Sequence, residues 1–257
     1  MRDASMSSHP LSRGERWLAS CLVAAIVAAI LLPPIAQSPA YHAFADQRTL
    51  LGIPYAADVL SSVAFAIVGG AAIAGLARVG RARHDRVSEA CLWSLAVALA
   101  STGNGSVVYH LDPRDATLVA DRLPMSLAFA SVLAMAVAQR ISARAGGVAL
   151  AVLPPLAMAS VLHWHATGNL APYAIVQYGA ALGIVAIVAA TPRRGDPFPW
   201  PWIVAGYALA KACEAGDAWI HASTGGIVAG HALKHFAAAA AGAAALLPAW
   251  RTVSREA

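Results

Sequence analysis

Charged residues are scarce in this chain of 257 residues: Asp, Glu, Lys and Arg make up only 12%, while 59% of the residues are hydrophobic. The mean hydropathy is +0.61, which excludes a soluble domain of ordinary composition. No long hydrophilic stretch remains from which a second domain could form. The sequence therefore predicts a single integral membrane domain over residues 1–257.

The sequence lacks the motifs that are typical of several classes of protein. The sequence contains no Gly-rich phosphate loop, no nucleotide fingerprint and no internal repeat. The net charge of +5 comes from arginines in loops, and no basic stripe with interleaved aromatics accompanies it, which argues against nucleic-acid binding. No protein partner is implied either. Cys21, Cys91 and Cys213 all lie in apolar runs, so we expect them to be small apolar groups and not disulfides.

Long apolar runs are what the sequence has in abundance. A run of about 18 or more apolar residues is typical of a membrane-spanning helix. Eight such runs occur, at residues 17–36, 57–79, 88–110, 118–138, 147–164, 171–190, 200–222 and 227–249. They predict an all-α fold, a polytopic membrane helical bundle. The first run could be a signal peptide, but its length of about 20 residues exceeds a typical signal core, so we expect a retained helix.

Arginines cluster in alternate loops of this predicted topology. They precede the first span and follow the second, fourth, sixth and eighth: Arg2, Arg13, Arg16, Arg78, Arg81, Arg83, Arg86, Arg140, Arg144, Arg193, Arg194, Arg251 and Arg255. Because positive loops stay on the cytoplasmic side, both termini are predicted to be cytoplasmic. The short loops and the composition rich in arginine and alanine favour a bacterial inner (plasma) membrane.

Five polar residues lie inside, or at the edge of, the predicted spans. They are Ser106, His110, Asp121, His231 and His235. In the predicted topology all five fall within roughly 10–12 Å of the outer membrane boundary. Polar groups at such depth are costly and mark functional sites. The arginines in the loops and the polar residues in the helices are independent signals. Together they place the five polar residues in one layer near the outer membrane boundary.

The histidines suggest a metal site. His231 and His235 are spaced i, i+4, so both imidazoles project from one helical face, although such a pair can also form interhelical hydrogen bonds. Together with His110 they could bind Zn²⁺ and leave its fourth tetrahedral position open for water.

Asp121 and Ser106 suggest the remaining parts of a hydrolytic site. Asp121 would be the general base, with a salt bridge to Arg122 or a helix N-terminal charge as the alternative. Ser106 would hydrogen-bond the developing oxyanion, with a bond to its own helix backbone as the alternative. The pattern predicts metal-assisted hydrolysis of an acyl compound.

Further polar residues accompany these. Lys211 and Glu214 are expected to neutralise each other. Asp217 could hold the N–H of a ligand histidine. Lys234 is expected to point away from the face of the two histidines and could pair with Asp217. The remaining membrane-edge histidines are expected to be solvated interface residues: His163, His165 and His221.

The five residues resemble the motif of the alkaline ceramidase family, part of a superfamily of seven-helix membrane hydrolases that also includes the progestin and adiponectin receptors. The family pattern has Ser-x3-His on one helix, an Asp eleven residues beyond that His, and a late His-x3-His. Residues 105–110 and 117–125 are similar beyond these positions, and the resemblance covers residues 44 to 245. It implies a seven-helix core over residues 44–250, with a tail and one extra helix in residues 1–40.

The resemblance also implies a function. The resemblance implies a zinc-dependent hydrolase that acts on the carbon–nitrogen bond of a linear amide. Such an enzyme would cleave ceramide-like lipids to a sphingoid or other amino-lipid base and a fatty acid. His110, His231 and His235 would bind Zn²⁺, and Asp121 and Ser106 would take the base and oxyanion roles. Eukaryotic members also carry an acidic calcium-binding segment, whereas residues 44–58 here are poorer in acids, which argues against calcium.

Two other functions fit the same polar residues less well. A receptor or sensor that keeps a zinc site would be favoured by large cytoplasmic loops or tails, and here these are short. A transporter would carry midplane polar groups or broken helices in paired halves, and no such pairing is evident. The sequence leaves open which lipid amide is cleaved and the oligomeric state.

Overall fold

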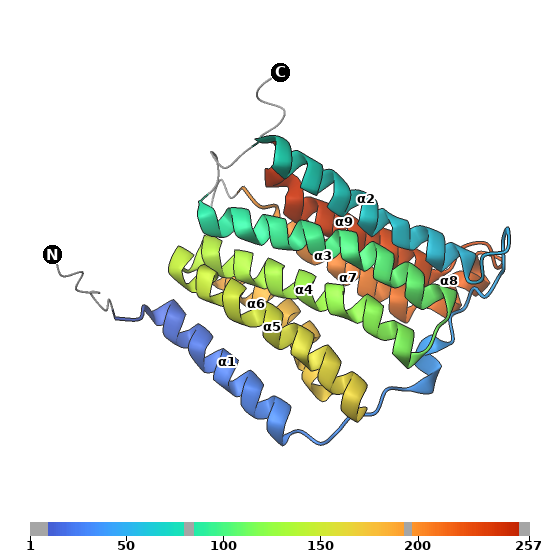
Figure 1. The fold of residues 1–257 in the computed structure, drawn as a ribbon, viewed down its shortest axis with the longest axis horizontal. Helices are drawn as coiled ribbons and strands as arrows, with labels where there is room; N and C mark the ends of the chain where they lie inside the picture. Colours follow the sequence, from blue (N-terminus) through green and yellow to red (C-terminus); the bar gives the residue numbers. More distant parts are fainter. Residues whose placement is uncertain (1–9, 80–84, 193–196, 252–257) are drawn as a thin grey trace.

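A computed structural model describes residues 10–79, 85–192 and 197–251, and within them all regular elements are helices (Figure 1). In chain order these are α1 (Arg13–Leu31), the 3-10 turn η1 (Pro39–His42), α2 (Ala56–Val79), α3 (Arg86–Leu111), α4 (Asp115–Arg140), α5 (Ala143–Thr167), α6 (Ala171–Ala190), α7 (Trp200–Ala215), α8 (Asp217–Ser223) and α9 (Gly230–Arg251). The predicted all-α polytopic bundle is confirmed.

Polar side chains fix where several helices begin. Ser12 and Glu15 form a capping box at the start of α1. Asp85 accepts hydrogen bonds from the first amides of α3, and Ser142 caps α5 in the same way. These caps satisfy amide groups that the first helical turn leaves without a partner.

Seven of the eight expected spans are helices long and apolar enough to cross a membrane: α1 to α6 and α9. The chain is therefore an integral membrane protein. The ends of α2, α4 and α9 lie at the same end of the bundle as the starts of α1, α3 and α5 (Figure 1). Seven described arginines lie at or beside these helix ends: Arg13, Arg16, Arg78, Arg86, Arg140, Arg144 and Arg251. Arg48, Arg114 and Arg122 lie toward the opposite end of the bundle. Arg2, Arg81, Arg83, Arg193, Arg194 and Arg255 fall outside the described residues.

The expected single span over residues 200–222 is wrong in one respect, because the structure divides it into α7 and α8. The helix α7 has 16 residues, about 24 Å at 1.5 Å per residue, which is less than the roughly 30 Å hydrocarbon layer. Gly216 ends α7, and Asp217 begins α8. The break lets the Asp217 carboxylate turn toward the start of α9. The expected last span also begins later, at Gly230 instead of 227.

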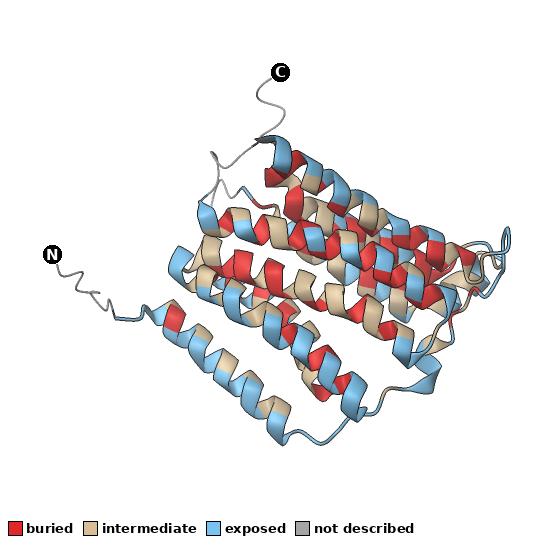
Figure 2. Ribbon diagram, in the orientation of Figure 1, coloured by how far each residue is buried: buried red, intermediate tan, exposed pale blue. Residues whose placement is uncertain are grey.

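Two clusters of buried side chains fill the bundle; Figure 2 colours the buried residues along the helices red. The larger cluster joins α2, α3, α4, α6, α7 and α9 and includes Leu92, Leu95, Met135, Trp200 and Leu246. The smaller one lies toward the opposite end and is formed by Phe44, Tyr109, Leu118, Val161, Trp164 and Tyr173. The helix α3 packs against α2, α4 and α9, so it is the element that joins the parts of the candidate site.

Candidate metal centre

Three imidazoles from two helices meet at the end of the bundle where α3 ends and α9 begins. His110 comes from α3, and His231 and His235 come from the first two turns of α9. One ligand nitrogen from each lies within 4.8 Å of the other two. The ring centroids are 4.9 to 5.0 Å apart in all three pairs. All three residues are buried, with at most 5% of their surface exposed.

The donor set fits a metal ion. Both ring nitrogens of His110 are buried without a hydrogen-bond partner, which is an unfavourable state for an imidazole that binds nothing. A neutral imidazole is also the most common metal ligand. Within the described part of the chain the group contains no fourth protein ligand. The arrangement therefore matches a three-histidine site with an open position more closely than a closed structural site.

Gly105 brings the fourth and fifth candidate residues beside these histidines. A Cβ at Gly105 would lie 2.0 Å from the carbonyl oxygen of Ala120 and 3.2 Å from the amide nitrogen of Asp121. The backbones of α3 and α4 thus touch at this point, and only glycine permits the contact. Ser106 and Asp121 follow directly on the two helices and are 1% and 7% exposed.

Ser106 and Asp121 interact with each other. The Ser106 hydroxyl is hydrogen-bonded to the Asp121 carboxyl, and the Ser62 hydroxyl of α2 lies 2.9 Å from Ser106 Oγ. The alternative for Asp121, a salt bridge to Arg122, is not what the geometry favours. The Arg122 guanidinium instead donates to Gln37 Oε1 at 2.7 Å and stacks on three aromatic rings, those of Tyr41, Trp164 and Tyr173.

His235 is oriented by Ser61, a residue outside the predicted set of site residues. Ser61 Oγ of α2 lies 2.8 Å from His235 Nδ1 and donates to the carbonyl oxygen of Asp58 at 3.1 Å. Because that serine proton is engaged, its oxygen accepts the Nδ1–H of His235, which leaves Nε2 with a free lone pair. Ser61, Ser62 and Asp58 are polar residues in an apolar run, and that feature was the available signal.

The surroundings of His231 correct two expectations. Lys234 does not point away from the histidines: its Nζ donates to His231 Nε2 at 2.9 Å and lies 3.4 Å from Glu214 Oε1. Asp217 does not reach the ring of His231 but accepts a hydrogen bond from its backbone N–H at 2.8 Å. A metal ion at this centre would therefore have to bind Nδ1 of His231 or displace the ammonium group from Nε2. The expected pair of Lys211 with Glu214 is present.

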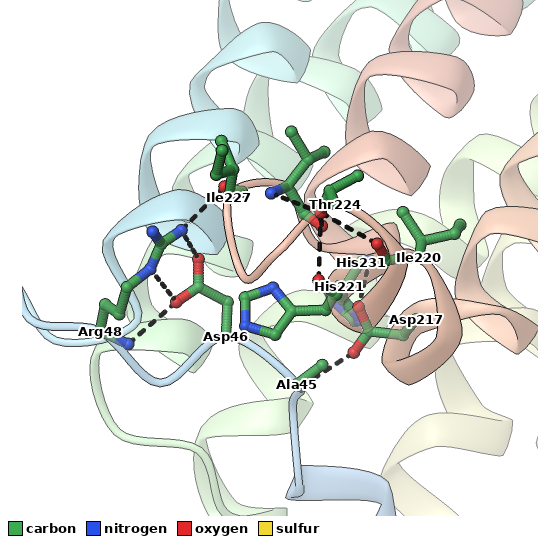
Figure 3. Close-up of polar contacts among 10 residues, drawn as sticks. Ala45, Asp46, Arg48, Asp217, Ile220, His221, Thr224, Ile227 and His231 are labelled. Carbon is green, nitrogen blue, oxygen red and sulfur yellow. Dashed lines mark hydrogen bonds and ion pairs between the residues drawn. The ribbon is translucent and has the colours of Figure 1, made fainter.

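Residues 44–48 cover the centre from the loop side. The Phe44 ring is 4% exposed and lies 4.8 Å from the ring of His110 and 4.4 Å from that of His231. The same Asp217 that holds His231 also accepts a hydrogen bond from the Ala45 amide at 3.0 Å (Figure 3). One carboxylate therefore fixes both the start of α9 and the segment that covers the centre.

An ion pair fastens this covering segment. Arg48 Nη2 donates to Asp46 Oδ2 at 2.6 Å and to the Ile227 carbonyl at 2.9 Å (Figure 3). This pair is not confined to the surface, because Asp46 is only 2% exposed. The hydrogen bonds from Arg48 hold the pKa of the Asp46 carboxyl below its usual range. Among the acids near the centre, Asp58 is fully buried with both carboxyl oxygens unpartnered.

His42, at the end of η1 and outside the expected spans, has two side-chain partners. Its Nδ1 lies 2.9 Å from the Tyr109 hydroxyl and its Nε2 lies 3.0 Å from Asp115 Oδ1. Since Tyr109 precedes the candidate ligand His110, this contact ties η1 to the metal centre. Nothing in the local sequence of His42 indicates it. His163 and His165 are exposed, as expected of interface residues.

No protein-family model matches this chain, and no curated protein and no solved structure matches it either.

Proposed function

We propose that this protein is a zinc-dependent membrane hydrolase that cleaves the amide bond of ceramide-like lipids. One observation carries the proposal: three buried imidazoles converge within 4.8 Å, beside a carboxyl group and a hydroxyl group at hydrogen-bonding distance from each other. Ionisable residues within a membrane are rare unless they pair with another polar group or have a functional role. Four of them together with a serine, gathered from three helices in one place, are typical of an active site.

The choice of Zn²⁺ rests on the donor set. Three imidazole nitrogens with an open fourth position are typical of catalytic zinc. When bound, Zn²⁺ lowers the pKa of water toward ~7 and polarises a carbonyl group. His110, His231 and His235 would hold it, with Ser61 orienting the ring of His235.

The remaining residues supply proton transfer and charge stabilisation. Asp121 takes a proton from the attacking water at its carboxylate and then delivers it to the leaving nitrogen. Once Asp121 has taken up that proton, the Ser106 hydroxyl is free to turn its own proton from the carboxyl group to the oxygen that gains negative charge. Phe44 covers two of the histidine rings, which keeps bulk water from the reacting atoms and strengthens the electrostatic interactions among them.

The substrate class and the setting follow from the resemblance and from the loop charges. The motif of Ser106, His110, Asp121, His231 and His235 resembles the alkaline ceramidase family, which favours a lipid amide that yields an amino-lipid base and a fatty acid. The positive-inside rule places the arginine-bearing end of the bundle in the cytoplasm. The centre would then lie toward the outer leaflet of a bacterial inner membrane.

The experiment that tests the proposal compares cells producing the wild type with cells producing His231→Ala. Lipid analysis should show fewer long-chain lipid amides and more free fatty acid in the wild type alone. Ala232→Gly, a neighbouring change that leaves all five residues in place, serves as the control for expression. An identical lipid profile in wild type and His231→Ala would remove the claim of enzymatic activity.

A further inference from the structure

Arg122 is a buried cation whose hydrogen-bonding capacity is largely unused. It lies in α4, roughly 10 Å from the start of that helix, and is 3% exposed. Its Nη2 donates to Gln37 Oε1 at 2.7 Å, whereas Nε and Nη1 are buried without a hydrogen-bond partner among the described residues. Buried donors that remain unsatisfied are unfavourable. The guanidinium is therefore incomplete without a further acceptor.

Arg122 also lacks a hydrogen-bonded acid within the described part of the chain. The Asp121 carboxyl is close enough for an electrostatic interaction, but it is hydrogen-bonded to Ser106. Asp115, nearer the start of α4, pairs with His42. Charged residues in an apolar layer almost always pair, and those that do not mark functional sites. What Arg122 lacks is thus an anion.

Three aromatic rings surround the guanidinium. Its Cζ lies 4.2 Å from the ring centroid of Trp164 on α5, 4.7 Å from that of Tyr173 on α6 and 5.1 Å from that of Tyr41. Such contacts stabilise the positive charge, but they do not supply the oxygen lone pairs that N–H donors bind. The rings therefore enclose the cation and leave its N–H groups available to an oxyanion.

The linker between α1 and α2 covers Arg122 and supplies only a neutral acceptor. This linker crosses the end of the bundle beside α4 and α5 (Figure 1). It is held at Ile35 by the turn that precedes α6 and at His42 by α3 and α4. Between these attachments Gln37 is half-buried and Tyr41 is 38% exposed. Since hydrogen bonds to an ionised group are roughly twice as strong as neutral ones, an oxyanion would displace the Gln37 amide.

We propose that Arg122 is the centre of an anion-binding site whose ligand is the carboxylate or phosphate group of a lipid. The anion takes the place of the Gln37 amide oxygen and lies among the three rings. A lipid fits better than a dissolved ion, because Arg122 lies within a span, beside the buried cluster that contains Trp164 and Tyr173. The site shares no residue with the candidate metal centre.

A carboxylate placed on the chain itself provides the first test. Gln37→Glu replaces the amide beside Arg122 with a carboxylate of the same shape. It should raise the thermal unfolding midpoint of the full chain in detergent by several degrees. Ser38→Glu adds the same charge at the exposed neighbouring position and should leave the midpoint unchanged. Equal midpoints for Gln37→Glu and the wild type would overturn the claim that Arg122 lacks an anionic partner.

Added amphiphiles test the ligand. Palmitate and hexadecyl phosphate carry the two anions, hexadecanol has the same chain without charge, and inorganic phosphate has the charge without the chain. A ligand that binds only the folded protein raises its unfolding midpoint. At least one anionic amphiphile should raise the midpoint of the wild type and of Ser38→Glu by several degrees. Neither should do so in Gln37→Glu, whose own carboxylate fills the site. A larger effect of palmitate would assign the site to a fatty acid, and a larger effect of hexadecyl phosphate would assign it to a phospholipid head group.

Three results would overturn the proposal. An equal rise with hexadecanol would show that no anion is recognised, and an equal rise with inorganic phosphate would show that the ligand is a dissolved ion. A rise that persists in Gln37→Glu would place the binding away from Arg122. A chelator should leave these shifts unchanged, because the contacts of Arg122 include no candidate metal ligand. Failure here is therefore distinguishable from failure of the zinc hydrolase proposal.

Discussion

The three candidate ligands differ in what holds each imidazole. His235 is oriented by Ser61, His231 is contacted by Lys234, and both ring nitrogens of His110 lack a partner. Partners of ligand histidines fix the tautomer and ring orientation and so affect metal affinity. We therefore expect the residues around the three histidines to have separable effects.

Ser61→Ala should weaken metal binding about 10–100-fold, the usual effect of removing the partner of a ligand histidine. The ring of His235 would lose the acceptor that keeps its Nδ1 protonated. Competition with a chromophoric chelator measures the change. Ser62→Ala is the matched control, because Ser62 contacts Ser106 and no histidine; equal weakening by both variants would contradict a specific role for Ser61.

Lys234→Met should strengthen metal binding. The ammonium group donates to His231 Nε2, and its positive charge opposes a divalent cation in a medium of low dielectric constant. The chelator competition should show a lower dissociation constant for this variant. A weaker affinity would mean that Lys234 supports the site and does not compete with the metal.

Asp121→Asn should lower amide hydrolysis by about 10²–10⁴-fold, the usual contribution of a general base, while the metal content stays unchanged. Fatty-acid release from a lipid amide by purified protein measures the rate. Asp112→Asn is the control, because Asp112 is exposed and pairs only with Arg114. If Asp121→Asn retained full activity, the proton-transfer role would have to be given up.

At the scale of the helices, the contact between α3 and α4 decides whether the centre can form. Gly105→Ala should lower stability by about 3 kcal/mol, the upper end of the cost of overpacking, because its Cβ would lie 2.0 Å from the Ala120 carbonyl oxygen. Gly70→Ala is the control in α2, where nothing lies within 4 Å. Thermal unfolding in detergent compares the two; similar values would show that the contact is dispensable.

The covering segment 44–48 should loosen in acid. Because Arg48 lowers the pKa of Asp46 in the folded state, the pair stabilises the segment above the usual carboxyl pKa, and this contribution is lost as the pH falls through the lowered value. The protection of the Ala45 and Arg48 amides against hydrogen exchange, relative to the intrinsic exchange rate at each pH, should therefore fall on acidification. Asp46→Asn should show the low protection already at neutral pH. Protection that does not change with pH would contradict this role of the pair.

At the scale of the whole molecule, the helical bundle could be predicted from the apolar runs in the sequence. Seven spans could be predicted because each contains a mostly apolar run of about 18 or more residues. The i, i+4 spacing of His231 and His235 placed both on one face. The break at Gly216 was not predicted, although the charged residues Glu214 and Asp217 flank it, because apolar residues resume at Ala218 and extend the run. The contacts of three residues could not be predicted: Ser61, Lys234 and His42. These contacts depend on how α2, α9 and η1 are oriented relative to α3, and no local sequence pattern indicates that orientation.

The central claim is that His110, His231 and His235 share one ion, and metal analysis of the purified protein tests it most directly. After exposure to zinc and removal of free metal, the wild type should retain a single Zn²⁺ per chain, and the alanine variant of any of the three histidines should lose it. Wild type without bound metal, or unchanged zinc in the three variants, would contradict the account.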